Sequence, residues 1–476
     1  MTKNKLICII TAIAVFAAGM FFQVVSGDTR VDRTHQHEKT SAIPEISIDV
    51  SGQEIPGAPL YSVSETGAIT EARYIHEDSE NVQGTLSYKD EDESAASDVL
   101  IHIRGNSSRY FQKKSYTFHL IDDNGLEKNL GFDGMGEADE WVLYGPYLDR
   151  TLIRNYMCLN IAGEVMDYAP AVRYVRLNID GEYQGLYVLM ETITREAGRL
   201  NLSKSRRNDY ATPYIVKLDR QRPNVEELDN YSRYTLKTGS LVYDLCYPGK
   251  DTLTDAKKTY IESDMSRIEK ILYSYDLNSS DIDYRDYIDI ESFAQYFVIN
   301  EFFGNLDAGF YSTYMYKDTR GKMHACVWDF NNACDNYAQE PADTSGFTIL
   351  YAPWFERLIR DQRFVDEVIK QYRKLRKTTL SDEYLQAYIT DTIDYLGPEI
   401  EDNYQVWGDV WTTEDKNAYV LANSYLQPLD RNYTSYDEAV TQLRTYITQR
   451  GQWLDENIDN LNQYCHESRI VNETLQ

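Results

Sequence analysis

The chain has 476 residues, a mass of 55.2 kDa and a formal charge of −28 at pH 7, from 76 acidic and 48 basic residues. Its 42% hydrophobic and 26% charged residues and mean hydropathy of −0.54 are typical of a globular protein, and they exclude collagen-like, wholly disordered and multi-span membrane classes. The acidic excess disfavours nucleic acid as a partner, so a bound phosphate requires a local cluster of Lys and Arg.

The N-terminus carries a candidate export signal. Lys3 and Lys5 precede an apolar run over residues 6–25. A basic start followed by about 20 apolar residues fits a retained membrane anchor and equally a long cleaved signal peptide. We therefore expect a signal peptide or membrane anchor at 1–27 and a polar tether at 28–42. The remainder is expected outside the cytoplasm, either membrane-anchored or secreted.

Short alternating runs predict β-structure from residue 43 onward. Polar and apolar residues alternate in ISIDV, GTLSY, VLIHIRG and SYTFHL, and Gly, Asn, Asp and Ser separate these runs. They predict a β-rich extension over residues 43–100 and two strands joined by the turn Arg104-Gly105-Asn106-Ser107-Ser108. The second strand, KKSYTFHL, begins with Lys113 and Lys114. The backbone of a glycine-containing turn can approach a ligand closely.

The middle of the chain reads as a helix followed by strands. Residues 153–166 have apolar positions at helical spacing behind Asp149, a predicted N-cap. A hairpin follows, YVRLNID and LYVLMETI, with Asp180-Gly181 as a strong turn signal. A further strand at 214–218 carries Lys217.

Helical patterns dominate after residue 263. A hairpin interrupts them, formed by STYMYKD and KMHACVWDF around Arg320-Gly321, and helices resume from 354 to about 461. We expect an α+β fold. The chain contains no HExxH, no Cys/His zinc spacing and no GxSxG, which disfavours zinc and serine hydrolases. The sequence is compatible with a disulfide between Cys326 and Cys334 and also with two buried free thiols.

Charged residues recur in the order that phosphoryl transfer requires. After the glycine turn come Lys114, a helix, two strands ending at Glu191, then Lys217, Asp307 and Asp329. Kinase sites use a Lys for phosphates, one Asp for the acceptor hydroxyl and a second Asp for Mg²⁺. Asp329 ends an apolar strand, where a carboxylate costs free energy unless it is paired or metal-bound. Each of these signals has a structural alternative. The glycine turn is then an ordinary hairpin loop, one of Lys113 and Lys114 is a solvated lysine, and Asp307 is a helix N-cap.

Several stretches resemble the spore-coat protein H (CotH) kinase family. They are RGNSSRYFQKKSYTFHL, VRLNIDGEYQGLYVLMETI, YIVKLD, NEFFGNLDAGFYSTYMYKD and VWDFNNACDNY, with WFERLIRDQRFVDEVIKQYRKLR and LRTYITQRGQWL nearer the C-terminus. The resemblance implies an atypical, secretory-type protein-kinase fold over residues 101–461, followed by a tail at 462–476. Its β-rich N-terminal lobe would span about 101–220 and its helical C-terminal lobe about 260–461.

The same resemblance implies ATP and Mg²⁺ or Mn²⁺ as cofactors, with Ser or Thr of surface or spore-coat proteins as acceptors. It assigns catalysis to Asp307 and metal binding to Asp329 and Asn331. Implied nucleotide contacts are Arg104, Asn106, Lys114 and Lys217, with Glu191 at a hinge to adenine.

Two positions depart from the family pattern. Asn331 stands where the family commonly has Asp in WDFD or WDYD, and Ser312 stands where usual kinases place Asn, five residues after the catalytic Asp. Both changes weaken Mg²⁺ ligation. The alternative function is therefore a catalytically weak pseudokinase that acts as a membrane-tethered binding scaffold at the surface or coat. The basic run at 203–207 favours either an acidic substrate or a solvated loop.

Overall fold

The computed structural model describes residues 42–63, 69–74, 81–91, 93–222, 225–235, 241–274, 277, 283–336, 343–411 and 433–466. These ranges belong to one compact unit, Arg33–Gln476. The predicted export signal at 1–27 and all but the last residue of the tether lie outside the described residues. Among the residues described, no helix has the length and apolarity needed to cross a bilayer.

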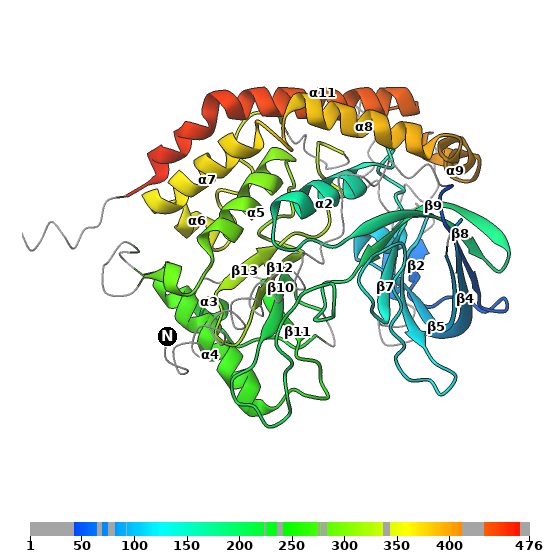
Figure 1. The fold of residues 1–476 in the computed structure, drawn as a ribbon, viewed down its shortest axis with the longest axis horizontal. Helices are drawn as coiled ribbons and strands as arrows, with labels where there is room; N and C mark the ends of the chain where they lie inside the picture. Colours follow the sequence, from blue (N-terminus) through cyan, green and yellow to red (C-terminus); the bar gives the residue numbers. More distant parts are fainter. Residues whose placement is uncertain are drawn as a thin grey trace, which may run out of the picture. The chain divides into compact units, whose positions relative to one another are not determined.

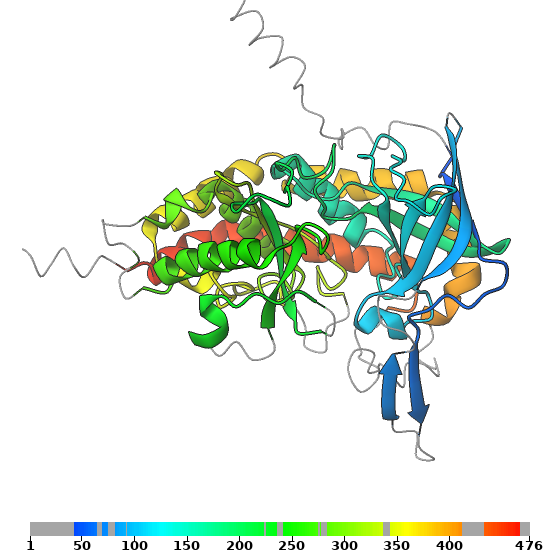
Figure 2. The ribbon, with the colours of Figure 1, turned by 90° about the horizontal axis from the view of Figure 1, so that it is seen from below.

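Seven strands close into a barrel in the order β1-β4-β5-β6-β7-β9-β8 (Figure 1). They are β1 (Glu45–Asp49), β4 (Val82–Lys89), β5 (Ser94–Arg104), β6 (Ser115–Ile121), β7 (Glu140–Tyr144), β8 (Val172–Ile179) and β9 (Glu182–Glu191). Neighbouring strands are antiparallel except β1 and β8, whose parallel pairing closes the barrel. β2 (Pro59–Val63) and β3 (Ile69–Tyr74) form a separate two-stranded sheet (Figure 2).

The alternation in these strands has a structural cause. Ile101, Phe118, Trp141 and Leu189 are fully buried, as expected for residues that fill a small closed barrel. Their sequence neighbours point to the opposite face, where the polar ones gather. The β8–β9 hairpin turns at Asp180 (φ 50°) and Gly181 (φ 80°), so the predicted hairpin is confirmed.

Helix α2 (Arg154–Val165) interrupts the barrel sequence between β7 and β8. The predicted N-cap, Asp149, is wrong in position, because the capping position is Ile153. Asp149 nevertheless accepts a hydrogen bond from the Arg154 backbone N–H at 2.7 Å, from five residues upstream. The residue satisfies the helix end without occupying the usual cap.

A second sheet has the order β11-β10-β12-β13. Its strands are β10 (Tyr214–Arg220), β11 (Leu241–Tyr247), β12 (Thr313–Lys317) and β13 (Met323–Cys326). The predicted β12–β13 hairpin is confirmed. Helix α5 (Ile290–Phe302) packs against β13, and α3 (Tyr231–Thr235) packs against α4 (Asp255–Leu272).

Helices make up the C-terminal part of the chain. They are α6 (Phe355–Leu358), α7 (Gln362–Leu375), α8 (Asp382–Leu396), α9 (Glu399–Trp407) and α11 (Tyr436–Asn457). α7 packs on α5, and α11 packs along both α8 and α5. Asp361 caps α7, Ser381 caps α8 and Ser435 caps α11, each through a side-chain oxygen, as these residue types favour. The predicted mixed α and β class is confirmed, whereas the closed barrel was not predicted.

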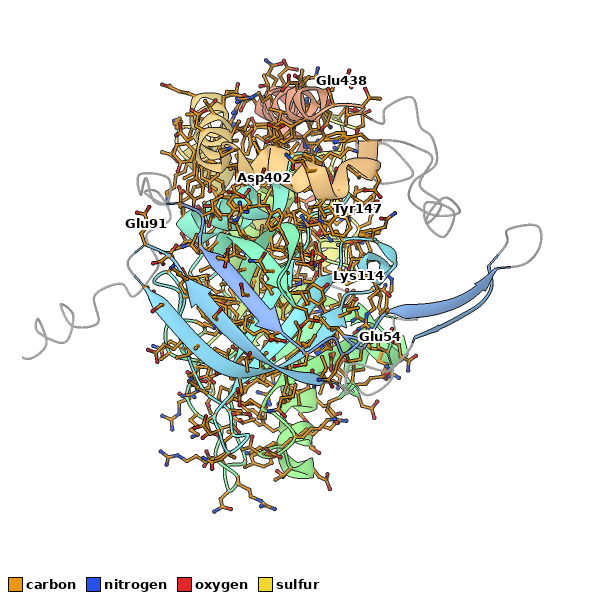
Figure 3. The ribbon with its side chains drawn as sticks, turned by 90° about the vertical axis from the view of Figure 1, so that its right-hand side faces the viewer. Glu54, Glu91, Lys114, Tyr147, Asp402 and Glu438 are labelled. Carbon is orange, nitrogen blue, oxygen red and sulfur yellow. The ribbon has the colours of Figure 1, made fainter. Side chains whose placement is uncertain are left out.

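Helix α9 and the 3₁₀ turn after it (η3, Gly408–Trp411) cross back onto the barrel, and we call residues 399–411 the clasp. The Asn403 side-chain oxygen accepts hydrogen bonds from the buried Lys113 Nζ at 2.6 Å and from Leu186 N at 3.1 Å. Trp407 Nε1 donates to the Gln184 carbonyl at 2.8 Å. In Figure 3, Asp402 of the clasp is labelled together with Tyr147 and Lys114 of the barrel region.

Candidate active site

A cavity of about 470 Å³ is lined by the outer face of the barrel and by the second sheet. Alternate residues of β5, β6, β7 and β9 contribute His102, Arg104, Ser115, Thr117, His119, Glu140, Val142, Tyr144 and Met190. The second sheet and the loops near it contribute Lys217, Asp219, Arg220, Arg222, Cys246, Asp307, Ser312, Tyr314, Trp328, Asp329, Asn331 and Asn332. Residues more than 200 positions apart in sequence thus share one polar cavity.

The cavity brings together six of the eight sequence-predicted site residues: Arg104, Asn106, Lys217, Asp307, Asp329 and Asn331. Lys114 and Glu191 do not line it. Lys114 Nζ donates to the carbonyls of Arg109 at 2.7 Å and Phe111 at 2.6 Å, while burial lowers the pKa of this amine to about 8. Glu191 accepts hydrogen bonds from Gly136 N at 2.9 Å and Ala171 N at 3.0 Å. Both side chains hold neighbouring backbone in place.

Glycine is required in the turn that follows β5. Gly105 has φ 112°, and a Cβ atom there would lie 2.0 Å from Ser108 Oγ. The Gly105 carbonyl accepts a hydrogen bond from Arg109 Nε at 2.6 Å. This bond and the two from Lys114 fix the turn, which places Asn106 and Ser108 in the cavity wall.

Asp307 and Asp329 are two of the carboxylates that line the cavity. Burial and the neighbouring Asp307 raise the pKa of Asp329 to about 6. Burial also raises the pKa of Asp307, although Arg220 opposes the shift. A carboxylate whose charge raises the pKa of its neighbour repels it when both are ionised, so a cation near Asp307 and Asp329 would stabilise the site.

The segment that carries Asp329 is held by side chains from distant elements. Asp329 has φ 53°, a conformation that Asp tolerates better than most residues. Its carbonyl accepts from Asn305 Nδ2 at 3.1 Å, and the next N–H, that of Phe330, donates to Asn155 Oδ1 at 2.6 Å. The Asp329 side chain itself accepts from Asn331 N at 3.2 Å.

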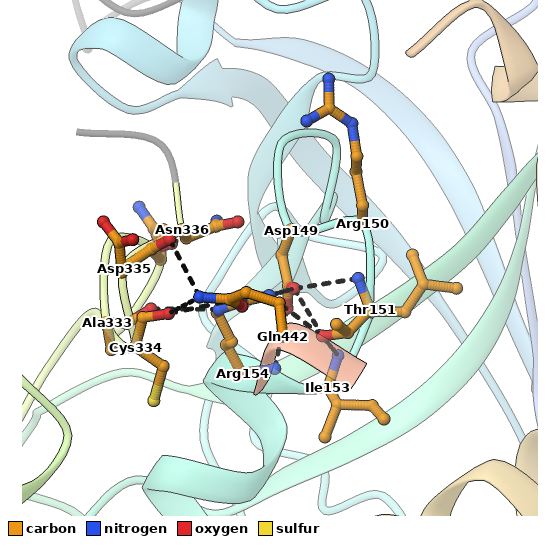
Figure 4. A network of polar contacts seen from close by, with 12 residues as sticks. Asp149, Arg150, Thr151, Ile153, Arg154, Ala333, Cys334, Asp335, Asn336 and Gln442 are labelled. Atoms are coloured by element: carbon orange, nitrogen blue, oxygen red, sulfur yellow. Dashed lines mark hydrogen bonds and ion pairs between the residues drawn. The ribbon is translucent and has the colours of Figure 1, made fainter. Parts of the chain in front are cut away.

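Helix α2 reaches the same segment through a second residue (Figure 4). Arg154 forms a buried ion pair with Asp149 at 2.6 Å, and its other nitrogens donate to the Ala333 carbonyl at 3.0 Å and to Gln442 of α11 at 2.7 Å. One guanidinium therefore joins α2, the segment after Asp329 and α11. This network and Asn155 together fix where the Asp329 carboxylate lies.

Two asparagines lie beside these carboxylates, and their amide oxygens differ. Asn331 Oδ1 accepts a hydrogen bond from Asn155 Nδ2 at 3.2 Å. Asn332 Oδ1 is buried and has no hydrogen-bond partner within the described part of the chain. A buried amide oxygen without a partner costs free energy, and such an oxygen is a ligand that Mg²⁺ accepts. The donor set Asp329, Asp307 and Asn332 therefore suits a divalent cation better than the sequence-predicted pair.

The cavity also gathers cations, although the chain as a whole is strongly acidic. The Arg104 guanidinium lies 5.6 Å from the Trp328 ring centre, and that of Arg220 lies 3.4 Å from the Tyr311 ring centre. Arg222 Nη2 pairs with Asp219 at 2.9 Å. Lys217 Nζ lies 3.7 Å from Asp219 and 3.8 Å from Asp244. Four positive groups at one face provide the local basic cluster that a polyphosphate requires.

The chain is similar to known proteins over most of its length. Residues 101–454 match the model of a family described as "CotH kinase protein". The chain belongs to the CotH kinase family. It is also 22% identical over 371 residues to the inner spore coat protein H of Bacillus subtilis (strain 168), a match that covers 76% of this chain and 88% of that protein.

Neither the residue pattern nor the CotH resemblance identified several of the residues that line the cavity. Asp219 has a period-two signal, because it follows Lys217 by two residues on β10 and so shares its face. Glu140 has the same period-two signal, because it alternates with Val142 and Tyr144 on β7 and all three residues line the cavity. Asn155 has no such signal, because it lies on a helix whose first nine residues are all buried.

Proposed function

We propose that this CotH family chain is an exported protein kinase. It would transfer the γ-phosphoryl group of ATP, in the presence of Mg²⁺ or Mn²⁺, to Ser or Thr hydroxyl groups of surface or spore-coat proteins. The observation that carries the proposal is the convergence of Asp307, Asp329 and four cationic side chains on one cavity. Phosphoryl transfer depends mainly on positioning and on neutralising charge, and these groups supply both.

Each group has a role in this proposal. Asp329 and Asn332 would hold the metal ion, which would supply neutralisation of the phosphate charge. Asp307 would orient the acceptor hydroxyl and take its proton, a role suited to a carboxylate whose pKa is raised by burial. Arg104, Lys217, Arg220 and Arg222 would contact phosphate oxygens, and the turn at Gly105 would cover them. The proposal implies a two-lobed kinase arrangement, in which the barrel would be the nucleotide-covering lobe.

The relative's name supports the location in the proposal, because that protein is an inner spore coat protein. The basic and apolar N-terminal sequence supports export of this chain. Cell fractionation with an antibody to the full chain would test this part: recovery in the cytoplasm alone would contradict export.

A second function is favoured by a specific observation. Among the residues described, no group of three or more His, Cys, Asp and Glu side chains is placed to hold a metal ion. Asn331 also replaces a charged ligand of the family pattern. A pseudokinase that binds partners at the surface or coat without chemistry would fit this weaker ligand set.

Incorporation of labelled γ-phosphate separates the two functions. The full chain is incubated with labelled ATP, Mg²⁺ or Mn²⁺, and a Ser-rich peptide. A kinase incorporates label, and Asp329→Ala and Asp307→Asn lose it at unchanged thermal stability, whereas Asp286→Ala, an exposed carboxylate outside the cavity, retains it. Absence of label together with absence of an ATP-induced rise in melting temperature establishes the scaffold instead.

A further inference from the structure

One acidic side chain of the cavity is not used by the proposed transfer. Glu140 begins β7 and pairs across the sheet with His119 of β6. Its backbone carbonyl is fixed by Thr192 Oγ1 at 3.2 Å and Arg199 Nη1 at 3.0 Å. Its carboxylate lines the cavity, and within the described residues it has no hydrogen-bond donor and no ion-pair partner. A half-buried carboxylate without a donor is costly, so a ligand donor would stabilise it.

Burial disfavours the ionised form of Glu140, and three of the four charged groups near it oppose that effect. Burial raises the pKa of the carboxyl group, and Asp139 adds to that effect, while His119, Arg199 and Arg104 oppose it. His119 Nδ1 is 3.2 Å from Asp139, and the Arg199 guanidinium stacks 4.4 Å above Trp141. Three positive or protonatable groups therefore face one carboxylate. In its ionised form, Glu140 accepts hydrogen bonds and cannot donate them.

The neighbouring acceptors at this end of the cavity are already occupied. The Thr192 carbonyl accepts from Thr194 N at 3.0 Å and from Tyr168 Oη at 3.4 Å, which uses both of its lone pairs. The Glu191 carboxylate is turned to backbone N–H groups outside the cavity. Of these three acceptors, Glu140 is the one without a donor among the described residues, and the apolar side chains of Val142, Met190 and Ile193 line the same cavity.

A cavity with apolar side chains and an acceptor without a donor suits the flat face and amino-bearing edge of a nucleobase. We propose that Glu140 is a specificity-determining residue that accepts a hydrogen bond from the exocyclic amino group of a 6-aminopurine. The inference rests on the proposed function, because it assumes that a nucleotide occupies this cavity. A purine without the amino group would leave the carboxylate unpaired, and a site built around such a bond rejects the analogue that lacks it.

The test compares binding of two nucleotides that differ only in this group. The dissociation constants of ATP and of purine riboside triphosphate, which has hydrogen in place of the amino group, are measured by calorimetry on the full chain with Mg²⁺. A hydrogen bond to a charged group predicts a preference for ATP of about ten- to a hundredfold. Glu140→Met, which has no acceptor of comparable strength, should reduce this ratio to about one by weakening ATP alone. Glu140→Gln, which keeps a neutral acceptor, should give an intermediate ratio.

Controls separate base reading from other effects. Glu137→Met changes an exposed carboxylate three residues away and should keep the wild-type ratio. Tripolyphosphate, which has no base, should bind wild type and Glu140→Met equally. Equal affinity of wild type for both nucleotides, or an unchanged ratio in Glu140→Met, overturns the role of Glu140 while leaving the proposed kinase intact. If neither nucleotide binds the folded wild-type chain, the proposed function and this inference both fail.

Discussion

The buried guanidinium of Arg154 offers the sharpest test of how the site is held. Arg154 and Asp149 each expose only 1% of their side chains, so neither charge is solvated by water. Replacing Arg154 with Met keeps most of the volume but leaves Asp149 without its partner. It also leaves the Ala333 carbonyl and the Gln442 side-chain oxygen without a donor.

The expected loss can be worked out from these contacts. Breaking a buried pair by removing one partner costs about 3–5 kcal/mol. Asp149 retains hydrogen bonds from Thr151 Oγ1 at 2.6 Å and Arg154 N at 2.7 Å, which places the loss near the lower end of that range. We expect Arg154→Met to lower the free energy of unfolding by about 3 kcal/mol. Removing both charges in Asp149→Asn/Arg154→Met should recover part of this loss.

Urea unfolding followed by tryptophan fluorescence measures the effect, because Trp141 and Trp354 are fully buried. Arg373→Met serves as the control: Arg373 pairs with Asp459 at 2.6 Å, but both side chains are more than half exposed, so the loss should stay below about 1 kcal/mol. A loss below about 1 kcal/mol for Arg154→Met would refute the reasoning. So would a double variant that is less stable than the single one.

Three further outcomes are expected. Metal binding should strengthen as the pH rises through about 6, because the Asp329 carboxyl must lose its proton to bind a cation. Asp307→Asn removes the charge that raises the pKa of Asp329, so it should move the pH midpoint of Mn²⁺ binding to a lower value. An unmoved midpoint would show that the two carboxyl groups are not coupled. Asn155→Leu deletes the hydrogen bonds to Phe330 N and Asn331 Oδ1, so it should weaken Mn²⁺ binding at least several-fold, as measured by electron paramagnetic resonance. Circular dichroism should show that nearly all of the fold remains. Equal Mn²⁺ affinity in the variant and the wild type would contradict the positioning role. Lys217→Met should weaken ATP binding about tenfold in calorimetry. Lys114→Met should lower the melting temperature and weaken ATP binding less than Lys217→Met does, because Lys114 acts only through the turn that it holds. A larger loss of ATP affinity in Lys114→Met than in Lys217→Met would restore Lys114 as the phosphate contact.

The sequence predicts local structure well where the signal is local. Alternation identified β1, β4, β5 and β6, and turn chemistry located the hairpins at Asp180-Gly181 and Arg320-Gly321. Closure of the barrel depends on the parallel pairing of β1 with β8, more than 120 residues apart, and no local pattern encodes it. β7 and β11 were also missed, because EWVLY and LVYDLCY lack the apolar–polar alternation of the strands that were identified.

For the site, six of the predicted side chains line one cavity, whereas the other two, Lys114 and Glu191, lie outside the lining and form hydrogen bonds with backbone groups. Lys113 and Lys114 are adjacent and both lie away from the cavity lining, since one binds the clasp and the other braces the glycine turn. Which lysine faces a phosphate depends on strand orientation and on the loops that follow. Lys217 lines the cavity, and so does Asp219, which lies two residues further along the same face of β10.

The clasp has a consequence for the order in which the molecule is completed. Lys113 and Asn403 are separated by 290 residues, so the bond between them forms only after most of the chain has left the ribosome. Until then, the buried amine beside the glycine turn lacks one of its two acceptors, the other being the Leu186 carbonyl. A nascent chain can therefore build the barrel strands before the clasp reaches the Lys113 amine. Burial of this amine with both of its acceptors in place is thereby delayed until synthesis is nearly finished.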